Sequence, residues 1–129
     1  MIASKIRPVL VVEDDPDLLE IMEIVLDSES YSVRKAFNGR DALIEARKEM
    51  PGLVLLDMQM PVMDGWEFAQ RFREEFASRA PIVVITAATD ARWRAEKIGA
   101  QGYLAKPFEI DDLISCVFKH YQKTQLADS

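Results

Sequence analysis

The stretch VLVVEDDPDLLEIM, residues 9–22, passes from four apolar residues through a cluster of acids into a helical pattern. Val9–Val12 is apolar on both alternating faces, which is typical of a strand buried on both sides in a parallel sheet. Asp15 and Pro16 then supply a helix cap and a proline at the first helical position. Like charges crowded beside a core are unfavourable, so the acids at this junction predict a nearby cation.

The same order of strand and then helix repeats along the chain. Three apolar runs predict buried strands and two mixed runs predict edge strands, in chain order Pro8–Val12, Tyr31–Phe37 (edge), Leu53–Leu56, Ile82–Ile85 and Gly102–Lys106 (edge). An apolar stripe at helical spacing follows each run. This alternation predicts an α/β fold: a doubly wound, five-stranded parallel sheet with five helices on its two faces. With the second and fifth strands at the edges, the strand order is 2-1-3-4-5.

Length and composition fit one domain over residues 1–129. The chain is 49% hydrophobic, enough to build a sizeable core, which we expect over about residues 7–121. The N-terminal arm, 1–6, and the C-terminal tail, 122–129, are expected to be frayed.

Charge and cysteine usage exclude several classes of protein. The formal net charge of −6 argues against direct binding to nucleic acid, which needs a basic patch. Cys116 is the single cysteine and is expected to be a buried, inert thiol, and His120, the single histidine, is expected at the surface. The sequence has no signal peptide and no run of roughly 20 apolar residues for crossing a bilayer, so we expect a cytoplasmic protein without membrane insertion.

Polar residues follow the central strands at their carboxyl ends, where ligands bind in sheets of this kind. Glu13 and Asp14 follow the first strand, Asp57 the third, Thr86 the fourth and Lys106 the fifth. Each residue alone is typical of a cap or turn, but their convergence at one edge is harder to explain in that way. Several carboxylates favour a hard cation, above all Mg²⁺. Lys106 and Thr86 would then hold the oxygens of a phosphoryl group on Asp57.

These motifs resemble the receiver domain of two-component response regulators, from about Arg7 to Tyr121. The segments that carry the resemblance are VLVVEDDPDLLEIM, LVLLDMQMPVMDGWEF, PIVVITAA and GYLAKPFEIDDL. The resemblance is to the single-domain, chemotaxis-regulator type with a flavodoxin-like fold. It implies a module of a phosphorelay that accepts a phosphoryl group from a phosphohistidine donor and later removes it by self-catalysed hydrolysis. Such a domain is not a conventional enzyme.

The resemblance also assigns roles in the metal site. Asp57 would be the phosphoacceptor and a metal ligand, and Asp14 a direct Mg²⁺ ligand. Glu13 would act through water, and the backbone carbonyl of Gln59 would be the third protein ligand. Mn²⁺ is a possible substitute for Mg²⁺.

Further roles concern the phosphoryl group and the switch. Lys106 would contact a phosphoryl oxygen and precede a cis peptide bond to Pro107. Thr86 would bond the phosphoryl group and act with Tyr103 as a switch that changes partner binding.

The partners implied by the resemblance are a sensor histidine kinase or a histidine phosphotransfer protein, and an unknown effector. The effector would bind the face formed by the fourth helix, fifth strand and fifth helix. Two alternatives remain: a small-molecule phosphatase with an aspartate nucleophile, and a pseudo-receiver that only binds partners. Gln59 stands where the phosphatase would need a second acid, two residues after Asp57. The sequence leaves open whether the domain stands alone or belongs to a longer protein.

Overall fold

A computed structural model of the chain describes residues 7–60, 62–76, 80–87 and 89–128, with the backbone alone over 122–128. Strands and helices alternate as the sequence predicts. Their bounds are β1 Val9–Val12, α1 Pro16–Ser28, β2 Val33–Ala36, α2 Gly39–Lys48, β3 Leu53–Asp57, α3 Gly65–Phe76, β4 Ile82–Ala87, α4 Ala91–Ile98, β5 Gly102–Lys106 and α5 Ile110–Asp128.

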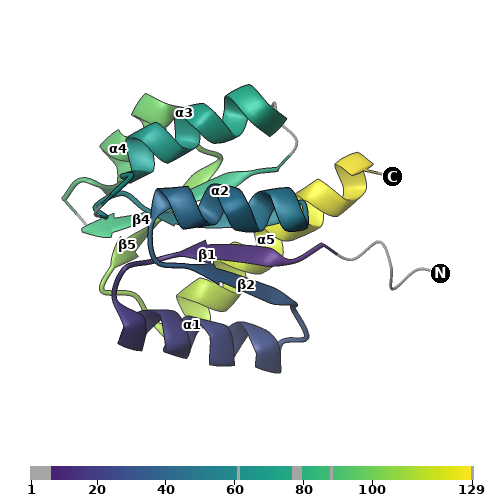
Figure 1. The fold of residues 1–129 in the computed structure, drawn as a ribbon. Helices are drawn as coiled ribbons and strands as arrows, with labels where there is room; N and C mark the ends of the chain where they lie inside the picture. The colour runs from purple at the N-terminus through teal and green to yellow at the C-terminus, as the bar shows by residue number, and fades with distance from the viewer. Residues whose placement is uncertain (1–6, 61, 77–79, 88, 129) are drawn as a thin grey trace.

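The five strands form one parallel sheet in the order β2-β1-β3-β4-β5, which confirms the predicted fold and order (Figure 1). The central strands β1 and β3 are buried along their whole length, whereas β2 is only partly buried. A strand covered on both faces must be apolar at every position, and this explains the uninterrupted run Val9–Val12.

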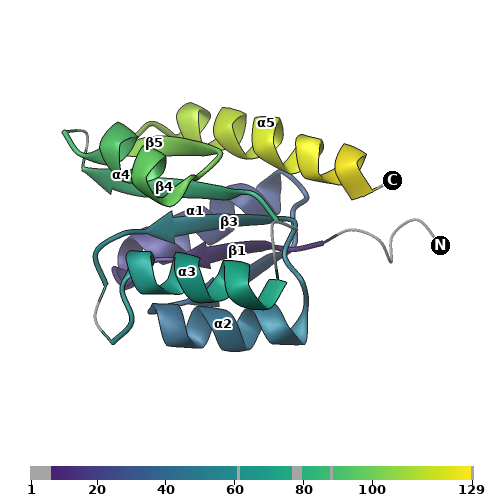
Figure 2. The ribbon, with the colours of Figure 1, turned by 90° about the horizontal axis from the view of Figure 1, so that it is seen from above.

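Helices cover both faces of the sheet, with α1 and α5 on one and α2, α3 and α4 on the other (Figure 2). Alternate residues of the three central strands enter different cores. Val9 and Val11 pack with α1 and α5, whereas Leu10 and Val12 pack with α2 and α3. All five strands run in the same direction, so their carboxyl ends lie at one edge of the sheet.

The start of α1 has the predicted cap. Asp15 Oδ1 accepts hydrogen bonds from the backbone N–H groups of Asp17, at 3.0 Å, and Leu18, at 3.4 Å, and Pro16 is the first helical residue. Asp15 is therefore occupied in capping the helix and does not belong to the acidic cluster.

The C-terminal helix is longer than the sequence predicts. We expect a frayed tail over 122–129, but the backbone continues as α5 through residues 122–128. The segment contains no glycine or proline, and Gln, Lys, Leu and Ala favour a helix. Residues 1–6 and 129 lie outside the described part of the chain. Among the described helices, none has both the length and the apolar character needed to cross a membrane.

Val62, in the loop before α3, has a φ of +69°, a left-handed conformation that β-branched residues avoid. Asn tolerates this conformation, so we expect Val62→Asn to raise the free energy of unfolding by about 1 kcal/mol in urea denaturation. The matched control is Ile24→Asn on α1. Ile24 is also exposed but has no left-handed backbone to relieve, and a comparable gain there would contradict the explanation.

Candidate functional site

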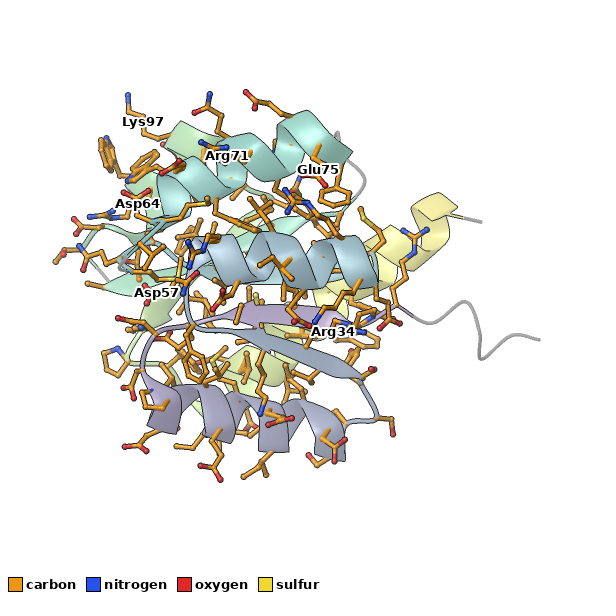
Figure 3. The ribbon with its side chains drawn as sticks, in the orientation of Figure 1. Arg34, Asp57, Asp64, Arg71, Glu75 and Lys97 are labelled. Atoms are coloured by element: carbon orange, nitrogen blue, oxygen red, sulfur yellow. The ribbon has the colours of Figure 1, made fainter. Side chains whose placement is uncertain are left out.

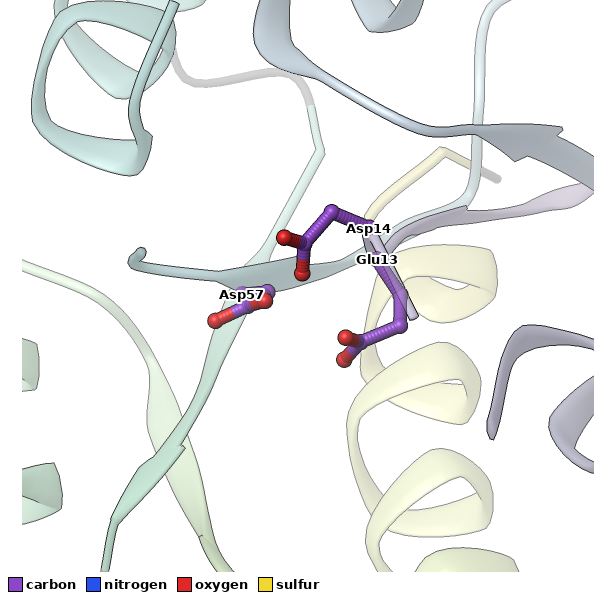
Figure 4. A group of neighbouring side chains, drawn as sticks. All are labelled: Glu13, Asp14 and Asp57. Atoms are coloured by element: carbon purple, nitrogen blue, oxygen red, sulfur yellow. The ribbon is translucent and has the colours of Figure 1, made fainter. Parts of the chain in front are cut away.

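Three carboxylates meet at the carboxyl edge of the sheet. Glu13 and Asp14 directly follow β1, and Asp57 is the last residue of the neighbouring strand β3. One oxygen from each of the three side chains lies within 4.8 Å of the others (Figure 4). Because β1 ends at Val12, the two acids lie outside regular strand geometry and both reach this cluster. That confirms the prediction that the acidic pair converges on Asp57.

Glu13 and Asp14 differ in their surroundings. Glu13 is buried, and its backbone N–H still donates to the carbonyl of Ala36 on β2. Glu13 Oε2 accepts from the backbone N–H of Asp15 at 3.2 Å. Asp14 is exposed. One member of the acidic pair is thus fixed inside the protein, and the other faces solvent.

Asp57 is buried and lies at the end of the sheet shown at the left in Figure 3. Its Oδ1 accepts a hydrogen bond from the backbone N–H of Gln59 at 3.1 Å, which favours the charged form. Burial is the largest influence on this carboxyl and, with Glu13 and Asp14 nearby, raises its pKa to about 7. Without a bound cation, ionisation of all three carboxylates at this site is therefore unfavourable.

Lys106, the last residue of β5, supplies a cation. Its Nζ lies 3.0 Å from Glu13 Oε1 and 3.8 Å from Asp57 Oδ2, so it pairs more closely with Glu13. Glu13 Oε1 nevertheless receives no hydrogen bond of good geometry, because the ammonium is close but poorly aligned. Within the described part of the chain, one ammonium is thus set against three carboxylates, and the cluster keeps capacity for a further cation. The peptide bond from Lys106 to Pro107 is cis, as predicted.

These groups line a cavity of about 800 Å³. Thr86, buried near the end of β4, lines it together with Ala87, Gln59 and the charged residues. Residues of α1, α5 and the loop before α5 form an apolar wall: Leu18, Ile21, Val25, Phe108, Ile110 and Leu113. A group placed on Asp57 would therefore have polar partners around it and an apolar wall alongside.

Comparison with known proteins identifies this arrangement. The family model described as "Response regulator receiver domain" matches residues 9–118. The chain belongs to this family. In receiver domains of two-component response regulators, an aspartate is phosphorylated in signalling, and the cluster around Asp57 fits that role.

Individual relatives agree with the family assignment. The ycf27 protein of Porphyra purpurea is 41% identical over 107 residues, which are 81% of this chain and 43% of that protein. The response regulator ArlR of Staphylococcus aureus is 32% identical over 83% of this chain and 49% of its own length. The structure of the chemotaxis protein CheY4 of Vibrio cholerae has a TM-score of 0.81 and 29% identity, over 89% of this chain and 98% of that one. The receiver domain thus spans less than half of each of the two curated relatives and nearly all of CheY4.

The predicted site residues separate into two groups. Glu13, Asp14, Asp57, Gln59, Thr86 and Lys106 all line the cavity. Tyr103 does not line it: the residue lies on β5, is 46% exposed, and is paired in register with Val84. Sequence reasoning missed the apolar wall. Its signal was the apolar stripe of the first helix, which includes Leu18 and Val25 and was assigned only to helix packing.

His120 is buried in the receiver domain, so its predicted surface position is wrong. Its ring packs beneath Gly102, where a Cβ atom would lie only 2.7 Å from Nε2. Nδ1 is 2.9 Å from the carbonyl oxygen of Cys116. Glycine on the edge strand leaves the space that admits the imidazole. Cys116 is only partly buried, which differs from the full burial that the sequence predicts. Burial nevertheless raises the pKa of its thiol to about 11, which agrees with the predicted inertness.

Asp57→Asn should stabilise the metal-free receiver domain at pH 8. The folded pKa of about 7 exceeds the ordinary value of 3.8, so ionisation of Asp57 opposes folding. This cost is absent below the ordinary pKa, grows between the two values and is complete above the folded pKa. A pKa shift of this size corresponds to about 4 kcal/mol, and solvent screening at the open side of the cavity reduces it. We expect a gain of about 2 kcal/mol in unfolding free energy at pH 8 that disappears near pH 4, measured by urea denaturation in EDTA.

The control for this prediction is Asp64→Asn. Asp64 is exposed, and its Oδ1 accepts from the backbone N–H of Glu67, a role that asparagine also fills. It should show no such gain. A pH-independent effect of Asp57→Asn would contradict the assigned cause.

Proposed function

We propose that this receiver domain accepts a phosphoryl group on Asp57 and that Mg²⁺ is required for the reaction. The observation that carries the proposal is the position of Asp57: buried, at the edge of an 800 Å³ cavity, between two acids and Lys106. A carboxylate oxygen of Asp57 forms the new P–O bond while the P–N bond of a phosphohistidine donor breaks. No histidine of this chain is needed, because the donor supplies the leaving imidazole.

The donor set supports Mg²⁺. Oxygen ligands suit this hard cation, which keeps several waters and uses few protein ligands. Asp14, Asp57 and the backbone carbonyl of Gln59 would bind it directly, and Glu13 through water; Mn²⁺ would be accepted in its place. When bound, the ion neutralises the carboxylates and the incoming phosphoryl oxygens. Glu13 Oε1, which is paired with Lys106 but receives no hydrogen bond of good geometry, and the raised pKa of Asp57 both fit a site that binds an additional cation.

The residues around the cation hold the phosphoryl group. Lys106 donates a hydrogen bond to one phosphoryl oxygen. To do so, its ammonium must move part of the way from Glu13 toward the phosphoryl group. The Thr86 hydroxyl donates to another. Water later attacks the phosphoryl group, so the domain also removes its own signal. These positions make catalysis a matter of orientation and charge neutralisation.

We further propose that Thr86 and Tyr103 form the switch. Thr86 is buried beside the cavity, whereas Tyr103 is 46% exposed on β5, next to β4. Movement of Thr86 toward the phosphoryl group frees space into which Tyr103 turns, and the two states differ in their affinity for partners. Trp93, Tyr103 and Phe118 are exposed aromatic residues of α4, β5 and α5, the face proposed for the effector.

The proposed partners are a cytoplasmic sensor histidine kinase or a histidine phosphotransfer protein as donor, and an effector of unknown identity. The domain is proposed to be a single receiver unit over residues 1–129. Its relatives' greater lengths are compatible with further domains in a longer protein. The alternatives of a phosphatase and an unphosphorylated pseudo-receiver have no observation in their favour: the family is that of receivers, and every charged site residue is present.

Incubation with acetyl phosphate tests the central proposal. With Mg²⁺ the protein should gain the mass of one phosphoryl group, measured by intact mass spectrometry. EDTA should abolish the gain. Asp57→Asn should also abolish it, since the amide cannot act as the nucleophile, whereas Asp64→Asn should be phosphorylated normally. Labelling that persists in Asp57→Asn would place the phosphoryl group elsewhere and defeat the proposal.

A second experiment tests the switch. The protein labelled with 3-fluorotyrosine should show a changed ¹⁹F signal of Tyr103 on addition of Mg²⁺ and beryllofluoride, with the signal assigned from Tyr103→Phe. Thr86→Ala should remain phosphorylatable but lose most of this change, because the moving side chain is gone. The control is Thr89→Ala, an exposed threonine in the connection that follows β4. An unaltered Tyr103 response in Thr86→Ala would reject the coupling.

A further inference from the structure

A second hollow of about 440 Å³ adjoins the phosphorylation cavity. Asp14 and Gln59 line both, so the two spaces meet at the rim of the acidic cluster. Asp64, Trp66 and Arg94 line the second hollow but not the phosphorylation cavity. Arg94 belongs to α4, whereas Gln59 and Asp64, which line the same hollow, belong to the loop after β3. In Figure 3 the labelled Asp64 and Asp57 lie at the same end of the sheet.

The guanidinium of Arg94 has few partners within the described part of the chain, although it is largely shielded from water. Its side chain is only 16% exposed, and its buried Nε has no hydrogen-bond partner. The one ion pair that the described residues give it is to Asp90, at 3.8 Å, too long for a hydrogen bond. Arg34, by contrast, donates to Glu45 at 2.7 Å and to Glu49 at 2.9 Å. Leaving a buried charged donor unpaired is unfavourable, so the geometry of Arg94 favours an anionic ligand.

The neighbouring acids are already engaged or assigned. Asp64 Oδ1 caps α3 by accepting from Glu67 N–H. Asp14 belongs to the proposed metal site. Lys106, the other cation at this edge, lies 3.0 Å from Glu13 and does not line the second hollow. Among the described residues that line the second hollow, Arg94 is the one cation, so an anion that enters there from the side of Gln59 meets its guanidinium.

We propose that Arg94 binds the phosphoryl group during its transfer to Asp57, acting from the second hollow while Lys106 acts from the first. This inference rests on the proposed function. In the reaction with acetyl phosphate, the P–O bond to the acetyl group breaks, a P–O bond to Asp57 forms, and acetate leaves. The planar guanidinium matches phosphate oxygens and stabilises the charge that develops on them.

The test compares the rates of Mg²⁺-dependent phosphorylation by subsaturating acetyl phosphate. Arg94→Met should lower the rate at least about tenfold, and Arg94→Lys should retain part of it because the charge remains without the planar fork. Arg92→Met is the matched control. Arg92 lies on the same helix, is 78% exposed and pairs with Glu96 at 3.2 Å, so its rate should stay within about twofold of wild type.

Tryptophan fluorescence separates a direct role from a structural one. Trp66 and Trp93 are the only tryptophans of the chain, and Trp66 lines the second hollow. A Mg²⁺ titration followed by this fluorescence should give the same affinity in Arg94→Met as in wild type. Slow phosphorylation with intact Mg²⁺ binding supports the inference.

Three outcomes overturn it: a normal rate in Arg94→Met, an equal loss in Arg92→Met, and a loss of Mg²⁺ binding together with phosphorylation in both Arg94 variants. Failure of the proposed function looks different. Wild-type protein would then gain no phosphoryl group, or Asp57→Asn would still gain one.

Discussion

Electrostatic repulsion among Glu13, Asp14 and Asp57 is the constraint on which the rest of the site depends. Folding brings their carboxylates within 4.8 Å of one another, although two are buried and, among the described side chains, only the ammonium of Lys106 is paired with them. Burial and neighbouring charge raise the pKa of Asp57, so the metal-free site is destabilised by its own ionisation. A bound cation removes this repulsion, so the free energy of cation binding also stabilises the folded state.

The scaffold tolerates such a site because its cost is localised at one edge. Two apolar cores, one on each face of the sheet, hold β1 and β3 in register, so that Val12 and Leu56 lie side by side just before the acids. The backbone positions of Glu13 and Asp57 are thus fixed by apolar packing, not by the charges themselves. Rigid strands that present residues at their ends give a reacting group the fixed geometry that phosphoryl transfer needs.

The helices on the two sides of the site contribute in different ways. On one side, α1 and α5 form the apolar wall of the cavity with Leu18, Ile21 and Leu113. On the other side, α4 brings Arg94 to the second hollow and exposes Trp93, which packs edge to face against Trp66 of α3. Arg73 of α3 also donates to the carbonyl oxygen of Gly99, just beyond α4. The helix α4, which carries Arg94 to the second hollow, is therefore held in place by contacts with α3.

The sequence alone determined the strand order, the capping role of Asp15 and the convergence of the charged residues, because these follow from local patterns and from the direction of parallel strands. It did not determine how far a side chain is buried. His120 is polar and stands near the C-terminus, yet the absent side chain of Gly102, eighteen positions earlier, admits it to the interior. Tertiary structure likewise decided that Lys106 pairs more closely with Glu13 than with Asp57. It also decided that Arg94 lies near the site. Such distances depend on packing between segments that are remote in the chain, and no local pattern encodes them.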